Sequence, residues 1–294
     1  MEPPPSGGRV TEDGGIQMQE NRHIELCYCG NGRIFPQVLL SVLSVVEHAS
    51  LPVHIHLLTM DLTSVDGRFT PFSPLQCEIL NEVVSEKYPE SSVRILDVKD
   101  PYIQLLGGGK NERGFYTPYA QLRLLADCVD LPEKFLYLDT DTMCCGDLKE
   151  LWENDVSGYE FAAVKDKEGK FWIRPDYCNS GVLLVNVPFC RETGLFERVR
   201  RRVRTRRMIM PDQSALNFLA KRKLILPRRF NEQGAIRADT VVKHFCRGFR
   251  WYGPFFRIYN IKQTDRENVH RKLNIFCFDD LYEKYDLLQQ KYGF

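Results

Sequence analysis

Short apolar runs that suit buried strands alternate with longer stretches that suit helices through the first half of this chain. The four strand-like runs are Ile24–Cys29, Val53–Met60, Val93–Val98 and Phe135–Leu138. The stretch Phe35–Ala49 carries a broad apolar stripe between the first two runs. Strands that alternate with helices in this way indicate βαβ units and a mainly parallel sheet. We therefore predict an α/β fold with helices flanking a Rossmann-like sheet, in which residues 21–145 form one half of a single domain.

The pattern is less regular after residue 145. Residues 146–260 are predicted to form a second half of the same domain, and residues 261–294 a helical C-terminal extension. The expected elements there are strands at Phe161–Val164, Val182–Val187, Leu224–Leu226 and Thr240–Val242, and helices at Asp147–Trp152, Arg191–Met208, from Pro211 onward and at Asp279–Tyr292. Residues 1–20 are rich in Pro, Gly, Ser and Gln and lack the pattern of a signal peptide, which predicts a disordered leader.

Composition excludes several classes of protein. The chain has 294 residues with 43% apolar and 27% charged residues, as in ordinary soluble proteins. A net charge of +1 selects neither nucleic acid nor a membrane as partner. No apolar run approaches 18 residues, so no transmembrane helix is expected. These features predict a cytoplasmic protein.

The ten cysteines support the same location. Five of them lie in apolar stretches, which favours reduced thiols in the core over disulfides: Cys27, Cys29, Cys128, Cys178 and Cys190. The pairs Cys27-x-Cys29 and Cys144-Cys145 lack the spacing of structural zinc sites.

Two carboxylates follow the fourth strand-like run directly. Asp139 and Asp141 are separated by Thr140, at the position where ligands collect beyond the carboxyl ends of strands in open α/β sheets. Their oxygens suit a hard divalent cation such as Mg²⁺ or Mn²⁺, and such an ion can hold a diphosphate. The alternative is that both aspartates only end the strand in a turn.

Four sequence blocks together decide between these alternatives. The blocks are Thr117-Pro-Tyr-Ala-Gln-Leu-Arg123 with Phe135-Leu-Tyr-Leu-Asp-Thr-Asp141, Tyr177-Cys-Asn-Ser-Gly-Val-Leu-Leu-Val-Asn186, Asp212-Gln-Ser-Ala-Leu-Asn217 with Arg229-Phe-Asn231, and His244-Phe-Cys-Arg-Gly-Phe-Arg250. Their order and spacing resemble glycosyltransferase family 8, the retaining transferases that include bacterial lipopolysaccharide galactosyl- and glucosyltransferases and glycogenin. The resemblance implies a GT-A type fold.

The resemblance also implies a set of metal and donor contacts. Asp139, Asp141 and His244 would bind Mn²⁺ (or Mg²⁺), with Thr140 beside the donor. Arg250 stands where the family has a lysine that touches the donor diphosphate, and an arginine can do so with a bidentate fork. For His244 taken alone, a hydrogen-bonded core histidine is the alternative.

A second group would surround the transferred sugar. The resemblance places Asn179 and Gly181 in a wall of the sugar pocket, whereas a turn asparagine and a packing glycine are the alternative. It places Asp212 and Gln213 beside the reacting carbon, whereas an N-cap aspartate and its neighbour are the alternative. An amide oxygen is a poor nucleophile, so Gln213 is expected to steady an oxocarbenium-like transition state.

Several donor positions depart from the family pattern. Gln121 replaces a basic residue that usually contacts the donor. Asn31 can still bond a base, but Ile34 replaces the aromatic residue that stacks on uracil. Gly248 lies one place later than the family glycine. The altered first loop and Gln121 keep open a second hypothesis, a nucleotide-sugar-binding protein that has lost transfer. A third hypothesis is a metal-dependent phosphotransferase that uses Asp139 and Asp141.

The expected function is therefore metal-dependent transfer of a hexose from a UDP-sugar to a glycan or lipid-linked acceptor, with retention. Two basic segments bear on the acceptor. Lys243–Lys272 mixes cations with aromatic residues and could rest on the inner face of a membrane. Arg198–Arg207 has seven arginines in ten residues, which suits a solvated helix, an acidic lipid or an anionic acceptor. Without interleaved aromatics there, nucleic acid is not an expected partner.

Overall fold

A computed structural model describes residues 23–112, 117–252 and 255–294, and the side chains of residues 250–257 lie outside this description. The expected leader, residues 1–20, also lies outside it. The strands are β1 (Ile24–Cys29), β2 (Val53–Thr59), β3 (Ser92–Asp97), β4 (Lys134–Leu138), β5 (Thr142–Cys144), β6 (Phe161–Lys165), β7 (Cys178–Asn186), β8 (Lys223–Leu226), β9 (Val242–His244), β10 (Gly248–Tyr252) and β11 (Phe255–Tyr259).

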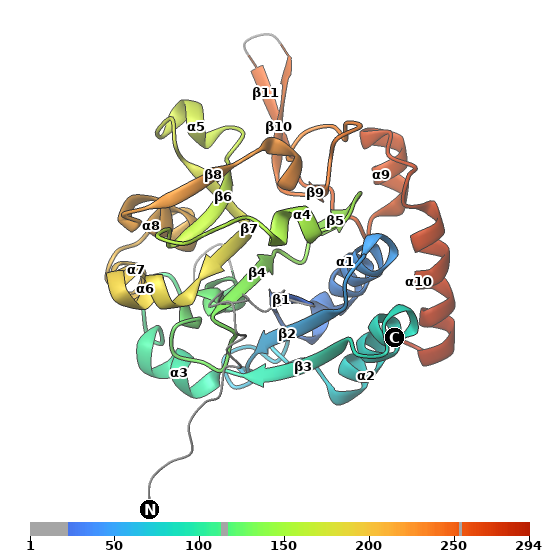
Figure 1. Ribbon diagram of the computed structural model, residues 1–294, viewed down its shortest axis with the longest axis horizontal. Helices are drawn as coiled ribbons and strands as arrows, with labels where there is room; N and C mark the ends of the chain where they lie inside the picture. The colour runs from blue at the N-terminus through green and yellow to red at the C-terminus, as the bar shows by residue number, and fades with distance from the viewer. Residues whose placement is uncertain (1–22, 113–116, 253–254) are drawn as a thin grey trace, which may run out of the picture.

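The helices cover both faces of the main sheet (Figure 1). The α-helices are α1 (Phe35–His48), α2 (Pro74–Lys87), α3 (Lys99–Leu105), α4 (Lys149–Trp152), α5 (Gly169–Trp172), α6 (Val187–Thr193), α7 (Leu195–Thr205), α8 (Pro211–Leu219), α9 (Arg266–Leu273) and α10 (Asp279–Tyr292). The 3₁₀ helices are η1 (Gly32–Ile34), η2 (Pro118–Leu125) and η3 (Arg228–Phe230).

The main sheet has seven strands in the order β3-β2-β1-β4-β7-β6-β8. Strands β3, β2, β1 and β4 run parallel, and β8 is parallel to β6. Strand β7 is antiparallel to both of its neighbours, β4 and β6. Two small ladders, β5 with β9 and β10 with β11, stand outside this sheet. The predicted α/β class with a mainly parallel sheet is confirmed.

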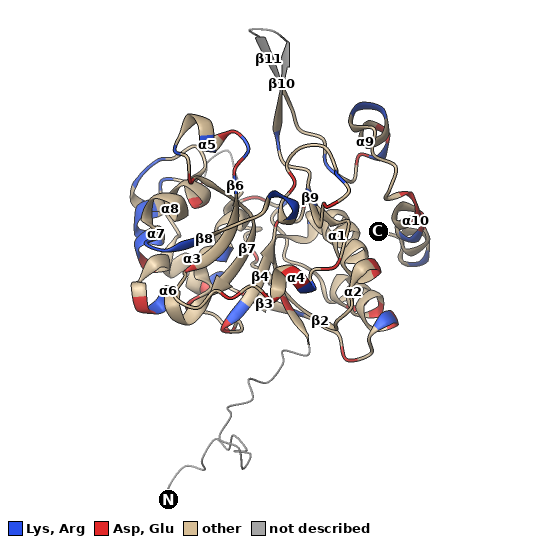
Figure 2. Ribbon diagram, turned by 45° about the horizontal axis from the view of Figure 1, so that its top comes forward, with Lys and Arg blue, Asp and Glu red and all other residues tan. Residues whose placement is uncertain are grey.

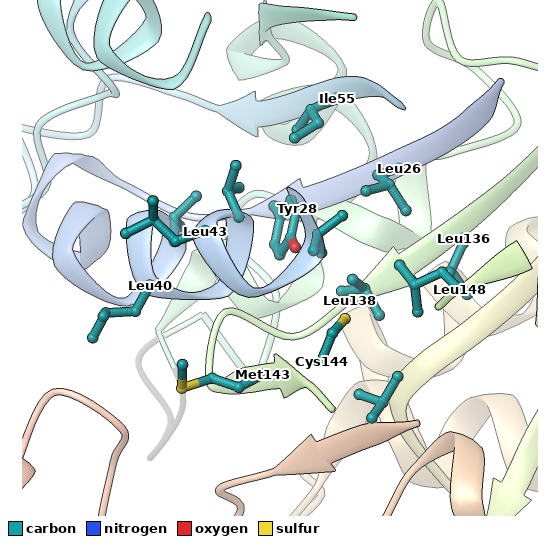
Figure 3. Close-up of a cluster of buried hydrophobic side chains, with 14 of the residues drawn as sticks. Leu26, Tyr28, Leu40, Leu43, Ile55, Leu136, Leu138, Met143, Cys144 and Leu148 are labelled. Carbon is teal, nitrogen blue, oxygen red and sulfur yellow. The ribbon is translucent and has the colours of Figure 1, made fainter. Parts of the chain in front are cut away.

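Alternate side chains of each strand enter two different cores, as the period of two in a strand requires. Leu26 and Tyr28 enter the core on the side of α1 and α2, whereas Cys27 and Cys29 enter the core on the opposite side. Figure 3 shows the first core, where side chains from β1, β2, β4, β5 and α1 meet; its labelled residues are Leu26, Tyr28, Leu40, Leu43, Ile55, Leu136, Leu138, Met143, Cys144 and Leu148.

Some local expectations are confirmed and others are wrong. Helix α2 begins with a capping box between Ser73 and Gln76, a residue pattern that is readable in the sequence. The expected helix Arg191–Met208 is instead two helices, because Gly194 adopts a left-handed conformation (φ 64°) between α6 and α7. The stretch after Thr117 forms the 3₁₀ helix η2. All ten cysteines are free, but Cys128 is exposed and does not belong to the core.

The arginine-rich run occupies α7 and the residues that follow it, where Figure 2 shows basic residues along the helix. Two of its arginines serve the fold. Arg200 is buried, forms an ion pair with Asp127 and donates to the Leu124 carbonyl at 2.7 Å. Arg198 donates to the Leu219 carbonyl at 2.9 Å. Part of the run therefore satisfies backbone groups of neighbouring elements.

Candidate functional site

The two aspartates lie where the carboxyl end of β4 meets the beginning of β7. Leu138 pairs with Val182, and the backbone N–H of Asp139 donates to the Gly181 carbonyl at 2.7 Å. Because β7 is antiparallel to β4, the first residues of β7 lie beside the last residues of β4. This arrangement brings Gly181 next to Asp139, although the two residues are far apart in the sequence.

The β5–β9 ladder brings His244 to the same place. Thr142 pairs with His244 across this ladder. The imidazole Nε2 lies 3.1 Å from Oδ1 of Asp141 and 3.7 Å from Oδ2 of Asp139. The ligand atoms of these three residues all lie within 4.8 Å of one another. The sequence expected His244 just after a strand ending at Val242, whereas β9 spans Val242–His244 and includes it.

A chain of hydrogen bonds fixes which nitrogen of His244 carries hydrogen. The Gly181 N–H donates to Oδ1 of Asn179 at 2.9 Å, and the same oxygen accepts from Nδ2 of Asn231 at 2.9 Å. The other side-chain atom of Asn231 is therefore its oxygen, and it lies 3.1 Å from Nδ1 of His244. Since an amide oxygen only accepts, Nδ1 bears the hydrogen. The lone pair of a neutral His244 is thus on Nε2, which faces Asp141.

The chemistry of the cluster fits a divalent cation. Two carboxylates and an imidazole form a mixed oxygen and nitrogen donor set of the kind Mn²⁺ accepts. The ammonium group of Lys262 donates to Oδ2 of Asp141, so a cation already lies against this carboxylate. Burial raises the pKa of Asp141, but His244 and Lys262 outweigh it and hold that pKa well below its usual range. The carboxylate therefore stays ionised and available as a ligand.

Arg123 lies between Asp139 and Asp212 and pairs with both. Its guanidinium is buried and lies 3.0 Å from Oδ1 of Asp139 and 3.1 Å from Oδ2 of Asp212. It also donates to the Ser180 carbonyl at 2.6 Å and lies over the ring of Tyr137. Burial raises the pKa of the Asp212 carboxyl, and the nearby Arg123 offsets only part of that increase.

Asn179 and Gln213 meet on a third carboxylate. The side-chain N–H groups of Asn179 and Gln213 lie 3.1 and 3.3 Å from Oδ2 of Asp166. Oε1 of Gln213 accepts from the backbone N–H of Ser180 at 3.0 Å. Gln213 and Asp212 both lie in the first turn of α8, so the start of this helix and the start of β7 form one polar wall.

The structure spreads the remaining expected residues over the neighbouring loops. Thr140 Oγ1 contacts the side chain of Gln37 at 3.3 Å, and Gln121 is buried with its amide 3.3 Å from the Asn111 carbonyl. Asn31 is buried at the start of η1, and its Oδ1 has no hydrogen-bond partner among the described residues.

Two of the expected donor-site residues, Gly248 and Arg250, belong to the β10–β11 hairpin. Gly248 faces Tyr259 so closely that an added Cβ would lie 2.4 Å from the Tyr259 oxygen. Arg250 pairs with Arg257 through the backbone of this hairpin, and its side chain lies outside the described part of the chain.

Sequence reasoning assigned no role to several residues of the site. Asn231 belongs to the third block and Lys262 to the basic and aromatic segment. Both therefore lie in segments that the sequence pattern singles out, although the pattern does not indicate their contacts. Asp166 follows strand β6 without any motif, and only its contacts with Asn179 and Gln213 reveal it.

The match to a family model decides the identity. The model described as Glycosyl transferase family 8 matches residues 25–275. The chain belongs to glycosyltransferase family 8. In this family member the ligand atoms of Asp139, Asp141 and His244 lie within 4.8 Å of one another.

Relatives with similar sequences agree with this assignment. The chain is 25% identical over 241 residues to a "Putative glycosyltransferase" of Haemophilus influenzae. The aligned region covers 72% of this chain and 67% of that protein. The chain is also 25% identical over 159 residues to the "Lipopolysaccharide 1,3-galactosyltransferase" of Salmonella typhimurium, in an alignment that covers 44% of this chain and 47% of that enzyme. The chain thus spans less than half of the second relative.

The fold is similar to that of the galactosyltransferase LgtC in complex with donor and acceptor sugar analogues. The TM-score is 0.59 at 16% identity, over 90% of this chain and 96% of LgtC. This likeness shows a GT-A type fold. In the described ranges, no helix is both long and apolar enough to cross a membrane.

Proposed function

We propose that this family 8 protein transfers a hexose from a UDP-sugar to a glycan acceptor with retention of configuration, with Mn²⁺ or Mg²⁺ held by Asp139, Asp141 and His244. The observation that carries the proposal is the convergence of these three side chains, with their ligand atoms within 4.8 Å, at the carboxyl end of β4. An ion bound there would neutralise the charge that develops on the leaving diphosphate.

The residues of the chain would divide the remaining work. Arg123 holds Asp139 and Asp212 at fixed positions through its two ion pairs. Asp212 places negative charge where the sugar ring becomes positive in the transition state. Gln213 and Asn179, both oriented by Asp166, would frame the sugar. Because Gln213 offers an amide and not a carboxylate, a long-lived covalent intermediate is not expected.

The donor site would include the first loop and the β10–β11 hairpin. The buried Oδ1 of Asn31 has no partner among the described residues, and a donor N–H of a base would satisfy it. Thr140 and Gly181 would lie beside the donor, and Gly248 would let the hairpin backbone approach it. Arg250 would hold the diphosphate with its guanidinium.

The acceptor would be a saccharide or a lipid-linked glycan. The Salmonella relative is named as a lipopolysaccharide galactosyltransferase, which supports an acceptor of this class. The basic and aromatic segment Lys243–Lys272 would then rest on the membrane surface that presents the acceptor.

One observation favours a second candidate, a protein that binds a nucleotide sugar without transferring it. Gln121 occupies the place of a basic donor-binding residue, and its amide lies against the Asn111 carbonyl. A site without that positive charge would hold the leaving diphosphate less firmly.

Release of UDP separates these candidates. The full chain is incubated with UDP-galactose, UDP-glucose and UDP-N-acetylglucosamine, each with Mn²⁺, Mg²⁺ or EDTA, and with or without a lactose acceptor. Transfer predicts UDP release that depends on one donor, on the metal and on the acceptor. Donor binding without release supports the second candidate. Turnover of nucleotides or phosphate esters without dependence on the sugar would indicate a phosphotransferase and contradict both.

A further inference from the structure

A cluster of three histidines and one glutamate lies at the opposite end of the sheet from Asp139 and Asp141. The imidazole–carboxylate cluster consists of His23, Glu25, His54 and His56. Glu25 in β1 pairs with His54 in β2, and Cys27 pairs with His56. Leu26 pairs with Leu136, so Glu25 is level with the beginning of β4. Four residues of strand separate that level from Asp139, or about 13 Å.

The cluster lies on the face of the sheet that elsewhere forms a core. Glu25 alternates with Leu26 and therefore lies on the same face as Cys27 and Cys29. At this end of the strands the face is partly open, since the side chains of His23 and His54 are 37% and 30% exposed. A polar cluster on an accessible sheet face can be reached by a dissolved ion.

His56 fixes the orientation of the Glu25 carboxylate. Nε of Arg94 donates to Nδ1 of His56 at 2.8 Å, so Nδ1 carries the lone pair and Nε2 carries the hydrogen. Nε2 then donates to Oε2 of Glu25 at 2.6 Å. His56 is buried, and Arg94 is itself held by Asp130. One oxygen of Glu25 is thus occupied, and the other, Oε1, faces the remaining two imidazoles.

A positive charge between Glu25 and His54 would stabilise their contact. Nε2 of His54 lies 3.2 Å from the Glu90 carbonyl, which can only accept, so Nε2 carries the hydrogen. In neutral His54 the lone pair is then on Nδ1, 3.5 Å from Oε1 of Glu25. Nε2 of His23 lies 2.9 Å from the same oxygen. Two lone pairs that face each other repel unless a proton or a metal ion lies between them.

We propose that His23, Glu25 and His54 form a binding site for Zn²⁺, separate from the catalytic metal site. Their ligand atoms lie within 4.8 Å of one another. Two imidazoles and one carboxylate suit zinc, whereas Mg²⁺ and Ca²⁺ prefer oxygen alone. The hydrogen bonds from His56 and to Glu90 supply the outer contacts that orient metal ligands. A bound ion would tie residue 23, where the chain enters β1, to the neighbouring strand β2.

Titration of the full chain with Co²⁺ and Zn²⁺ tests the proposal, with the double variant His23→Gln/His54→Gln for comparison. The wild-type protein should bind one more equivalent of metal than the double variant, and Zn²⁺ should raise the Tm of the wild type more than that of the variant. Because both side chains are partly exposed, the variant should fold and should keep its donor-dependent UDP release. Circular dichroism checks the fold.

Two further variants sharpen the test. His48→Gln removes an imidazole from α1, away from the cluster, and should bind as many equivalents as the wild type. His56→Gln keeps all three ligands but frees Glu25, and should weaken binding of the extra equivalent about tenfold to hundredfold. A merely structural role of His56 would leave that affinity unchanged.

The Co²⁺ difference spectrum between wild type and double variant identifies the ligands. The ten free thiols could also bind the ion, and thiolate ligands would add a sulfur-to-cobalt charge-transfer band. A difference spectrum without that band supports the site. Equal numbers of bound equivalents in the wild type and the double variant, or a thiolate band in the difference spectrum, would overturn the proposal. The positive charge beside Glu25 would then be a proton on His54.

Discussion

The backbone of Gly181 lies so close to the imidazole of His244 that no side chain fits between them. A Cβ on Gly181 would lie 2.2 Å from Cε1 of His244, 2.7 Å from its Nδ1 and 2.8 Å from Oδ2 of Asp139. The absence of a side chain at position 181 therefore allows the β4 carboxylate and the β9 histidine to meet. The glycine serves a close approach of side chains and not a special backbone angle.

Gly181→Ala should consequently displace His244 or Asp139 and weaken metal binding. We expect a lower Tm and a loss of most Mn²⁺-dependent activity, measured by thermal unfolding and by Mn²⁺ titration of the initial rate. Gly146→Ala is the matched control, because the nearest atom to its added Cβ is 3.8 Å away. If Gly181→Ala bound Mn²⁺ like the wild type, the packing argument would be wrong.

Asp141→Asn should abolish metal-dependent turnover while the fold survives. Loss of the charge stabilisation should cost about a thousandfold or more in rate. Asp141 is a cleaner target than Asp139, because Asp139 also pairs with the buried Arg123. The measurement is UDP release with saturating donor across a Mn²⁺ series, with Asp155→Asn, an exposed aspartate, as control. Full activity of the wild-type protein in EDTA would contradict the proposal that turnover requires a metal ion.

Asn231→Ala should lower the affinity for Mn²⁺ without removing a ligand. The Asn231 oxygen accepts from Nδ1 of His244 at 3.1 Å and so keeps Nε2 free for an ion. Loss of such an outer contact typically costs about tenfold to hundredfold in metal affinity. Calorimetric titration with Mn²⁺ measures the change, and activity should return at high Mn²⁺. Asn154→Ala, in the turn that follows α4, should leave the affinity unchanged.

Gln213→Ala should lower kcat by about tenfold to hundredfold, the scale of one lost transition-state contact. Asp212→Asn should lower kcat at least as much, because it removes a negative charge beside the developing cation. Both kcat and KM are measured with the best donor, and NMR gives the anomeric configuration of the product. An inverted product would contradict retention. A wild-type kcat in both variants would mean that these two residues only begin helix α8.

Asp212→Asn should also raise the Tm at pH 7, even as it lowers kcat. Burial raises the pKa of Asp212 in the folded protein, so ionisation costs stability as pH rises from the unfolded-state pKa through the folded one. The cost grows as the pH rises, so the advantage of asparagine should be larger at pH 7 than at acid pH. Asp155→Asn should show the opposite sign, since the Ser157 hydrogen bonds lower the pKa of Asp155. A lower Tm for Asp212→Asn at pH 7 would mean that its pairing with Arg123 outweighs the cost of burial.

The sequence by itself determined the local elements and the residues of the motif. The apolar run of β4 ends at Leu138, just before Asp139, and Ser73 caps α2. Both features are local, because strand burial and helix capping depend on neighbours in the chain. The sequence also predicted that Asp139, Asp141 and His244 form a ligand set, and the structure places these three side chains together. Local signals failed where a glycine alone decided the geometry, as at Gly194 between α6 and α7.

Only the tertiary structure decided how the site is assembled. The antiparallel insertion of β7 beside β4 places Asn179 and Gly181 at the aspartates, and the β5–β9 ladder places His244 opposite Thr142. The contacts through which Arg123, Asp166, Asn231 and Lys262 join the site are with residues that are distant in the chain. Strand direction and register depend on contacts between residues distant in the chain, which no local pattern encodes. For that reason the sequence predicted which side chains act, and the fold decided which of them touch.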